Sequence, residues 1–208
     1  MDTQATKKQT NSAKRVNVHY LTVTAMLSAV SYILMFCDFS IPMVIPSFIK
    51  MDLSELPALI GSFSMGPACG VLVCLIKNLL HLAITETGGV GELSNFILGA
   101  AFVLPAGLIY KHKKTRKSAL IGSVVGAVVM GLISVVSNYY LVYPVYYNFT
   151  PKEAVLAAYR AILPGMQNIL QCLVCFNMPF TIVKGLCSVA ITFLIYKHIS
   201  PILKGVER

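Results

Sequence analysis

The sequence contains no tryptophan and few charged residues. Asp, Glu, Lys and Arg together account for 12% of its 208 residues, whereas a water-soluble domain carries about 25%. Hydrophobic residues account for 56%, and the mean hydropathy is +0.74. This composition excludes an ordinary cytosolic enzyme and a disordered tail, and it indicates a protein embedded in a lipid bilayer.

Acidic residues are particularly scarce. The chain has 8 Asp and Glu against 17 Lys and Arg, which gives a formal net charge of +9. A nucleic-acid partner is excluded because the chain as a whole carries so few charged residues. In a membrane protein, Lys and Arg collect in the loops on the cytoplasmic side, so the basic residues indicate topology instead.

Metal-binding and catalytic patterns are also missing. The six cysteines lie within or at the ends of apolar runs, which favours packing over disulfide bonds. Cys172 and Cys175 form a CxxC pair, but no second Cys or His pair stands at zinc-site spacing. The apolar runs contain no Ser/His set, paired Asp or HExxH motif, so we expect no enzymatic activity, no metal and no cofactor.

Six apolar runs divide the chain, and most are long enough to cross a membrane. The second run is too short to span in standard helical geometry, so the runs alone allow five or six spans. With six spans, the basic N-terminal tail, the loop 111–117 with its five Lys and Arg, and the C-terminal end share one side. Charge placement therefore favours six spans with both termini cytoplasmic. The runs are 20–37, 53–65, 68–84, 93–110, 119–141 and about 166–199.

The predicted fold is all-α, a six-helix transmembrane bundle in the cell membrane with a short second helix. A single membrane domain is expected at 20–199. Cytoplasmic tails at 1–19 and 200–208 flank it. The external side carries a loop at about 38–52, which contains two prolines, and a short helix at about 151–163.

The external helix is predicted from a capping box. Thr150 occupies the N-cap position of this pattern, Pro151 the first helical position and Glu153 the third. We expect the helix to connect the last two spans on the external face.

Polar residues inside the apolar runs carry the functional signal, because an ionisable group in hydrocarbon is costly and usually functional. In the last run, Asn177, Thr181 and Lys184 recur at helical spacing and form one stripe. By predicted depth, these residues and the polar residues of the other runs lie in the outer half of the bundle. This placement predicts a pocket open to the outside rather than a channel. The polar residues of the other runs are Lys77, Asn78, His81, Glu92, Asn95, Ser134 and Asn138.

Some of these residues have structural explanations as well. Lys77 is expected either to contact a ligand or to form a buried ion pair with Glu55 or Glu92. His81 fits a satisfied interfacial histidine better than a ligand contact. Asn78 also suits hydrogen bonding between helices.

A glycine-rich segment at 88–91 precedes Glu92. It lacks the preceding strand and the Gly-Lys-Ser sequence of a phosphate loop. The segment instead predicts a tight turn that brings backbone amides and carbonyls to the pocket rim.

Several motifs, in order along the chain, resemble the riboflavin-binding S components of energy-coupling factor (ECF) transporters, the RibU family. The resemblance covers nearly the whole chain from about residue 20 and continues into its C-terminal end. The motifs are PSFIKMDLSELPALIG at 46–61, LIKNLLH at 75–81, GGVGELSN at 88–95 and PFTIVKG at 179–185.

The resemblance implies a six-helix bundle that binds riboflavin from outside, with the loop 38–52 as a lid over the pocket. It also implies a transmembrane scaffold subunit and two ATP-binding subunits as partners. The scaffold subunit is expected to contact an Ala-x-x-x-Ala surface on the first helix. Ala25 and Ala29 match that pattern, and Ser28 lies beside them.

For the substrate, the resemblance suggests contacts at Asn138 and Lys184. The chain departs from the family at Thr181, where the family commonly has Asn. Either Asn177, one turn away on the same stripe, supplies the missing amide, or this contact is weaker or mediated by water.

The chemistry of riboflavin is compatible with these residues. An Asn amide pairs with the imide edge of the flavin ring, and a Lys ammonium donates to a ring carbonyl. The glycine-rich backbone and Glu92 suit the ribityl hydroxyls, while Phe39 or Phe48 of the lid covers the rings. The predicted substrate-binding residues are therefore Asn138, Lys184, Asn177, Thr181, Glu92, Gly88, Gly89, Gly91, Asn95, Lys77, Asn78, Phe39 and Phe48.

An alternative function remains compatible with the sequence. It is a small secondary transporter for another vitamin or small amphiphile, coupled to protons or sodium through Lys77, Glu92 and His81.

Overall fold

The computed structural model describes residues 18–41, 45–46, 49–85, 88–148 and 150–203, with side chains up to residue 195. The described chain is helical, with one isolated β-bridge between Phe39 and Met51. The helices are α1 (Val18–Met35), α2 (Glu55–Ser64), α3 (Pro67–His81), α4 (Val90–His112), α5 (Arg116–Ser137), α6 (Tyr143–Tyr146), α7 (Lys152–Ile162), α8 (Ile169–Cys172) and α9 (Met178–Leu203). A 3₁₀ turn, η1 (Leu82–Ile84), follows α3, and two π-helical turns, η2 (Asn138–Val142) and η3 (Leu173–Asn177), interrupt the later helices.

Five stretches of the described chain are long and apolar enough to cross a membrane. They are Val18–Met35, Pro67–Ile84, Val90–His112, Arg116–Tyr146 and Ile169–Ile195. The run predicted as a short second span forms α2, which has 10 residues and is about 15 Å long. Nine of the ten residues of α2 are buried, so this helix belongs to the centre of the bundle rather than to its lipid-facing surface.

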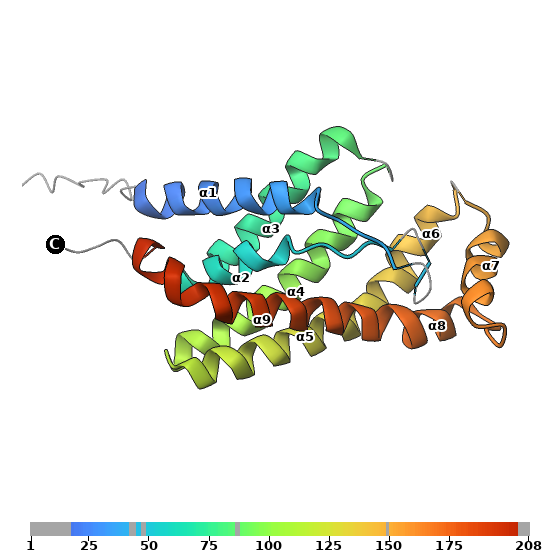
Figure 1. Ribbon diagram of the computed structural model, residues 1–208. Coiled ribbons are helices and arrows are strands. Elements are labelled where there is room, and N and C mark those ends of the chain that lie inside the picture. The colour runs from blue at the N-terminus through green and yellow to red at the C-terminus, as the bar shows by residue number, and fades with distance from the viewer. Residues whose placement is uncertain (1–17, 42–44, 47–48, 86–87, 149, 204–208) are drawn as a thin grey trace, which may run out of the picture.

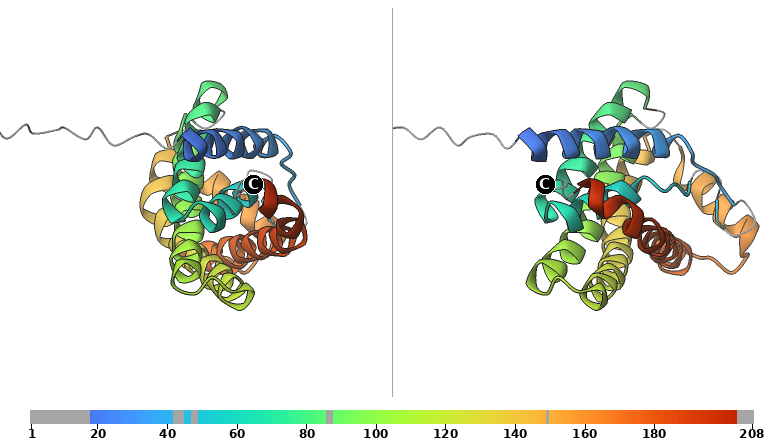
Figure 2. Two further views of the ribbon diagram at one scale, coloured as in Figure 1. Left: turned by 90° about the vertical axis from the view of Figure 1, so that its left-hand side faces the viewer. Right: turned by 60° about the vertical axis from the view of Figure 1, so that its left-hand side comes forward.

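The long helices pack side by side into one bundle (Figure 1). α5 packs between α4 and α9, and α2 contacts α1, α3, α4 and α9, as the turned views also show (Figure 2). The start of α1, the end of α9 and the α4–α5 connection lie at one end of the bundle, and α7 lies at the other (Figure 1). The basic loop therefore lies at the same end of the bundle as the start of α1 and the end of α9.

The helix predicted for the external side, α7, begins at Lys152, one residue later than predicted, and the predicted capping box is wrong. Pro151 occupies the N-cap position with an extended ψ of 141°, and the start of α7 has no side-chain cap. The amide of Thr150 donates instead to the carbonyl of Tyr146, because the chain is still turning out of α6 there. α7 is held by packing, since Val155 and Tyr159 are buried in an apolar cluster with residues of α6, α8 and η3.

A close approach between α4 and α5 depends on Gly126. A Cβ atom at this position would overlap the carbonyl oxygen of Phe102 and lie 3.2 Å from its ring. We expect Gly126→Ala to lower the free energy of unfolding by about 1 to 2 kcal/mol, because overpacking outweighs the better helix propensity of Ala. Thermal unfolding in detergent measures the effect.

Gly165→Ala is the matched control for this prediction. A Cβ at position 165 meets nothing within 4 Å, so its unfolding temperature should stay close to that of the wild type. Equal stability of the two variants would show that α4 and α5 move apart without cost.

Candidate substrate-binding site

A cavity of about 740 Å³ lies among the ends of α1, α3, α4, α5 and α9 and the segment 49–52. Its volume is in the usual range for small-molecule sites. It has both polar and apolar walls, with Leu98, Met130 and Phe180 among the apolar residues. Seven predicted substrate-binding residues line it: Gly91, Glu92, Asn95, Asn138, Asn177, Thr181 and Lys184.

Two of the three amides that line the cavity lie on π-helical turns. Asn138 begins the turn η2, and Asn177 ends the turn η3. Their residues are 8% and 6% exposed, so both amides are almost fully enclosed. A π turn places an extra residue in a helix and often marks a functional site. No feature used in the sequence analysis predicted these turns.

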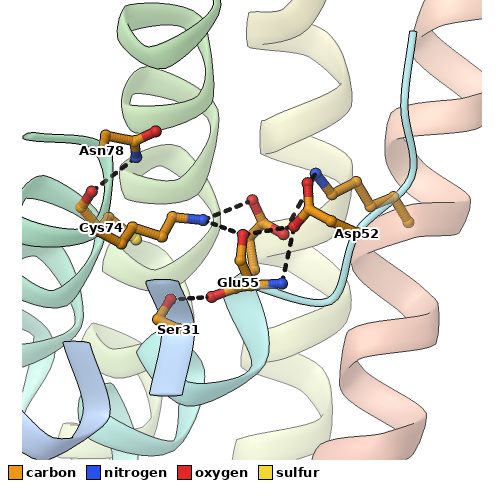
Figure 3. Close-up of polar contacts among 8 residues, drawn as sticks. Ser31, Asp52, Glu55, Cys74 and Asn78 are labelled. Atoms are coloured by element: carbon orange, nitrogen blue, oxygen red, sulfur yellow. Dashed lines mark hydrogen bonds and ion pairs between the residues drawn. The ribbon is translucent and has the colours of Figure 1, made fainter. Parts of the chain in front are cut away.

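Four charged residues form a cluster, and two of them, Asp52 and Lys184, line the part of the cavity here called its floor. Figure 3 shows the polar contacts around Asp52 and Glu55. The ammonium of Lys184 lies 2.9 Å from Oδ2 of Asp52 and 3.4 Å from Oε2 of Glu55. The ammonium of Lys77 lies 3.3 Å from Oε1 of Glu55 and also donates to the hydroxyl of Ser54. The two cations and two carboxylates balance one another, which makes their burial tolerable.

Only two of the four charged residues are in contact with the cavity. Asp52 and Lys184 line it, whereas Glu55 and Lys77 do not. Lys77 is fully buried, and its contact with Glu55 confirms the predicted alternative of a buried ion pair between these two residues. Burial would raise the pKa of the Asp52 carboxyl, but Lys184, Lys77 and the Ser54 hydroxyl together hold that pKa below its ordinary value. Asp52 is therefore a carboxylate beside the Lys184 ammonium.

Glu92 is another acidic residue that lines the cavity, in the part here called its rim. Its Oε1 lies 2.8 Å from Nδ1 of His81, and its Oε2 accepts a 2.9 Å hydrogen bond from the hydroxyl of Thr85. Gly88 and Gly89 form the turn that leads into α4, with φ values of 63° and 90° that favour glycine. These contacts fix the Glu92 carboxylate at the cavity wall.

Other predicted site residues lie away from the cavity. The Asn78 amide donates to the Cys74 carbonyl of its own helix, and Phe39 is 51% exposed and pairs with Met51. Phe48 lies outside the described residues. Lys77, Asn78, Phe39, Gly88 and Gly89 do not line the cavity, so the structure does not bring them to it.

Several lining residues were not predicted. Asp52 is the most important of them. It stands directly before the second apolar run, and this position in the sequence did not indicate which cation it would pair with. Its contact with Lys184 joins residues 132 positions apart, which periodicity does not reveal. The other lining residues include Asp38, Ile49, Lys50, Tyr143, Tyr146 and Phe180.

Comparison with known proteins decides the family. A sequence profile described as "ECF transporter, substrate-specific component" matches residues 19–196. The chain belongs to this family. The members of the family are subunits of transporters and not enzymes.

Individual substrate-specific components are similar over almost their whole length. The "Riboflavin transporter RibU" of Staphylococcus aureus (strain TCH60) is 31% identical, covering 94% of this chain and 100% of the relative. The "Riboflavin transporter FmnP" of Bacillus subtilis (strain 168) is 29% identical over 89% of this chain and 94% of the relative. A solved structure, described as the S component of a bacterial ECF transporter, is 32% identical with a TM-score of 0.71, covering 89% and 98% of the two chains.

The first helix of this substrate-specific component carries the small-residue pattern on its outer surface. Ala25 and Ala29 are exposed, whereas Ser28 is buried and donates to the Thr24 carbonyl. The two alanines are thus available to another helix and are not used for packing inside the bundle.

Proposed function

We propose that this substrate-specific component binds riboflavin from the outside of the cell and delivers it inward together with a transmembrane scaffold subunit and two ATP-binding subunits. The observation that carries the proposal is the cavity, in which the amides of Asn138 and Asn177 and the Asp52–Lys184 pair line a space suited to a small molecule. The riboflavin transporters of S. aureus and B. subtilis, similar along nearly the whole chain, support the identity of the ligand.

The floor of the cavity suits the flavin ring. The imide edge of this ring alternates carbonyl oxygens with an N–H group. The Lys184 ammonium has three N–H donors, and Asp52 and Glu55 engage only part of them. We assign Lys184 and Asn138 to the ring edge, with Lys184 donating to a carbonyl.

The rim suits the ribityl tail. The Glu92 carboxylate accepts hydrogen bonds from hydroxyl groups, and Asn95 and the backbone of Gly91 line the same wall. The apolar residues Leu98, Met130 and Phe180 cover the faces of the rings.

The proposed topology has six spans, α2 being the short one, and cytoplasmic termini. The start of α1, the end of α9 and the α4–α5 connection lie at one end of the bundle (Figure 1). That connection contains the basic loop 111–117, and basic loops face the cytoplasm. The cavity, near the opposite end, then opens to the outside.

An ion-coupled transporter finds less support. The contacts described for Lys77 run to Ser54 and Glu55, whereas His81 and Glu92 contact each other at the rim. These contacts do not join the three residues into one relay.

Purified protein tests the proposal directly. It should bind riboflavin in equimolar amount, seen as quenching of flavin fluorescence, and should accumulate it in liposomes only when the scaffold, the ATP-binding subunits and ATP are present. Uptake by the isolated protein under an ion gradient alone would instead establish a secondary transporter.

The segment 38–52 is expected to act as the lid. Asp38, Ile49, Lys50 and Asp52 line the cavity, and the Lys50 side chain, paired with Asp38 at 3.0 Å, is 48% exposed. Riboflavin should therefore slow tryptic cleavage at Lys50 several-fold, because the ligand holds the segment in place. Mass spectrometry of the digest measures the rate.

Cleavage within the loop 111–117, at the opposite end of the bundle, is the internal control and should not change (Figure 1). An unchanged rate at Lys50 as well would show that the segment is fixed without ligand.

A further inference from the structure

We propose that Tyr159, on the external helix α7, is a positioning residue that turns the Asn177 amide so that its NH₂ group faces the cavity and donates to the ligand. The inference uses riboflavin as the ligand and so rests on the proposed function. It concerns a residue that does not itself line the cavity.

A chain of hydrogen bonds links α7 to the cavity wall. The Tyr159 hydroxyl donates to Oδ1 of Asn177 at 2.7 Å. A hydroxyl has a single proton, so in its 2.7 Å contact with the Tyr143 hydroxyl, Tyr159 must be the acceptor. The chain therefore runs from Tyr143 through Tyr159 to Asn177, and each donor has a defined direction.

This arrangement fixes which end of the amide meets the ligand. Oδ1 of Asn177 is engaged by Tyr159, so the NH₂ group, which lies near the Tyr143 hydroxyl, is the end of the amide that is left to face the cavity. Without the Tyr159 hydroxyl, the amide can turn over, because its terminal torsion has two similar orientations. The amide could then present its carbonyl oxygen, in place of its N–H donors, to the ligand.

Tyr159 is well suited to hold another side chain. It is fully buried, its ring lies 5.5 Å from that of Phe176, and it belongs to the apolar cluster that attaches α7 to the bundle. Burial raises the pKa of its phenol, so the hydroxyl keeps its proton at neutral pH. A rigid, protonated donor is what a fixed amide orientation requires.

The amide of Asn138 is not held in this way. Among the described residues, no hydrogen bond is formed by the side chain of Asn138, which leaves it free to donate and to accept. Asn177 therefore supplies a fixed donor one turn from Thr181, the position where the resemblance to the family leads one to expect an amide. Under this inference, Asn177 supplies the amide for which Thr181 has no equivalent group.

The experiment compares riboflavin affinity by fluorescence titration of the full-length protein in detergent. Tyr159→Phe should weaken binding roughly three- to tenfold, the range for one oriented hydrogen bond. Tyr147→Phe is the matched control, because Tyr147 packs in the same cluster, with its ring 6.0 Å from that of Tyr143, and does not line the cavity. Its affinity should equal that of the wild type.

A double-mutant cycle separates positioning from general packing. In an Asn177→Ala background, Tyr159→Phe should cause no further loss of affinity, because no amide remains to be oriented. The same loss in both backgrounds would overturn the inference, since it would mean that Tyr159 supports the fold and not Asn177. Wild-type affinity of Tyr159→Phe would overturn it as well.

If Tyr159→Phe does not fold, Asn177→Asp carries the test. It keeps an acceptor for the Tyr159 hydroxyl and removes the amide donor, so affinity should fall at least threefold, and wild-type affinity would overturn the inference.

A wild-type protein that does not bind riboflavin would overturn the proposed function and this inference together. Wild-type binding with an unaffected Tyr159→Phe variant would overturn the inference alone.

Discussion

Lys184→Met is expected to weaken riboflavin binding about 10- to 150-fold, because it removes a charged donor from the cavity floor. The variant should also lose stability. Lys184 contacts Asp52 at 2.9 Å and Glu55 at 3.4 Å, and its removal leaves an uncompensated buried carboxylate. Breaking such a buried pair from one side costs about 3 to 5 kcal/mol. Fluorescence titration and thermal unfolding measure the two effects.

A second substitution separates these two roles of Lys184. In the double variant Lys184→Met/Asp52→Asn, one cation and one carboxylate are removed together, and the Lys77–Glu55 pair remains. Most of the lost stability should return, because the cluster is neutral again, but binding should stay weak because the donor is still missing. Double-variant protein with wild-type affinity would show that Lys184 is a structural residue only.

Lys152→Met is the control for the loss of a lysine. Lys152 is exposed at the start of α7, at the end of the bundle near the cavity, but it does not line the cavity itself. Neither its riboflavin affinity nor its unfolding temperature should change appreciably.

Replacing Ala25 and Ala29 together with Trp is expected to abolish riboflavin uptake by the complete transporter. Both alanines are exposed on α1, and close packing of another helix against this surface requires small side chains. Two indole rings would hold the scaffold subunit away from the backbone of α1. Uptake in liposomes that contain the scaffold and ATP-binding subunits should fall to background, whereas riboflavin binding to the isolated variant should equal that of the wild type.

The matched control places two Trp residues at the same spacing on another exposed face. Val124 and Val128 on α5 are 40% and 43% exposed, and the double Trp variant there should transport normally. Loss of binding in the α1 variant would mean that the alanines support the bundle itself. Normal uptake by that variant would mean that the scaffold subunit docks elsewhere.

The structure changed the interpretation of the charged residues more than that of the polar stripe. Asn177, Thr181 and Lys184 were predicted to share one face of the last helix, and all three line the cavity. Lys184 was expected to meet either a flavin carbonyl or, in a structural role, a carboxylate. Its contacts with two carboxylates give it that role as well, because a charge inside the bundle must be compensated even when no ligand is bound.

The sequence by itself determined the class of the protein, the position of the long helices and the stripe on the last one. The class follows from the composition of the chain. The long helices and the stripe follow from the spacing of residues within one segment, which can be seen without knowing how the segments pack. The resemblance to the riboflavin-binding S components also depends on short motifs in order, and the comparisons bear out the family.

Only the tertiary structure decided which groups meet. Asp52 and Lys184 are separated by 132 residues, and they come together because the buried helix α2 carries the end of the segment 49–52 into the bundle beside α9. The turn η3 places Asn177 in the cavity, where the Tyr159 hydroxyl on α7 reaches its amide. A repeat of apolar residues shows which face of a helix is buried, but the partner of each polar side chain depends on how the helices pack against one another.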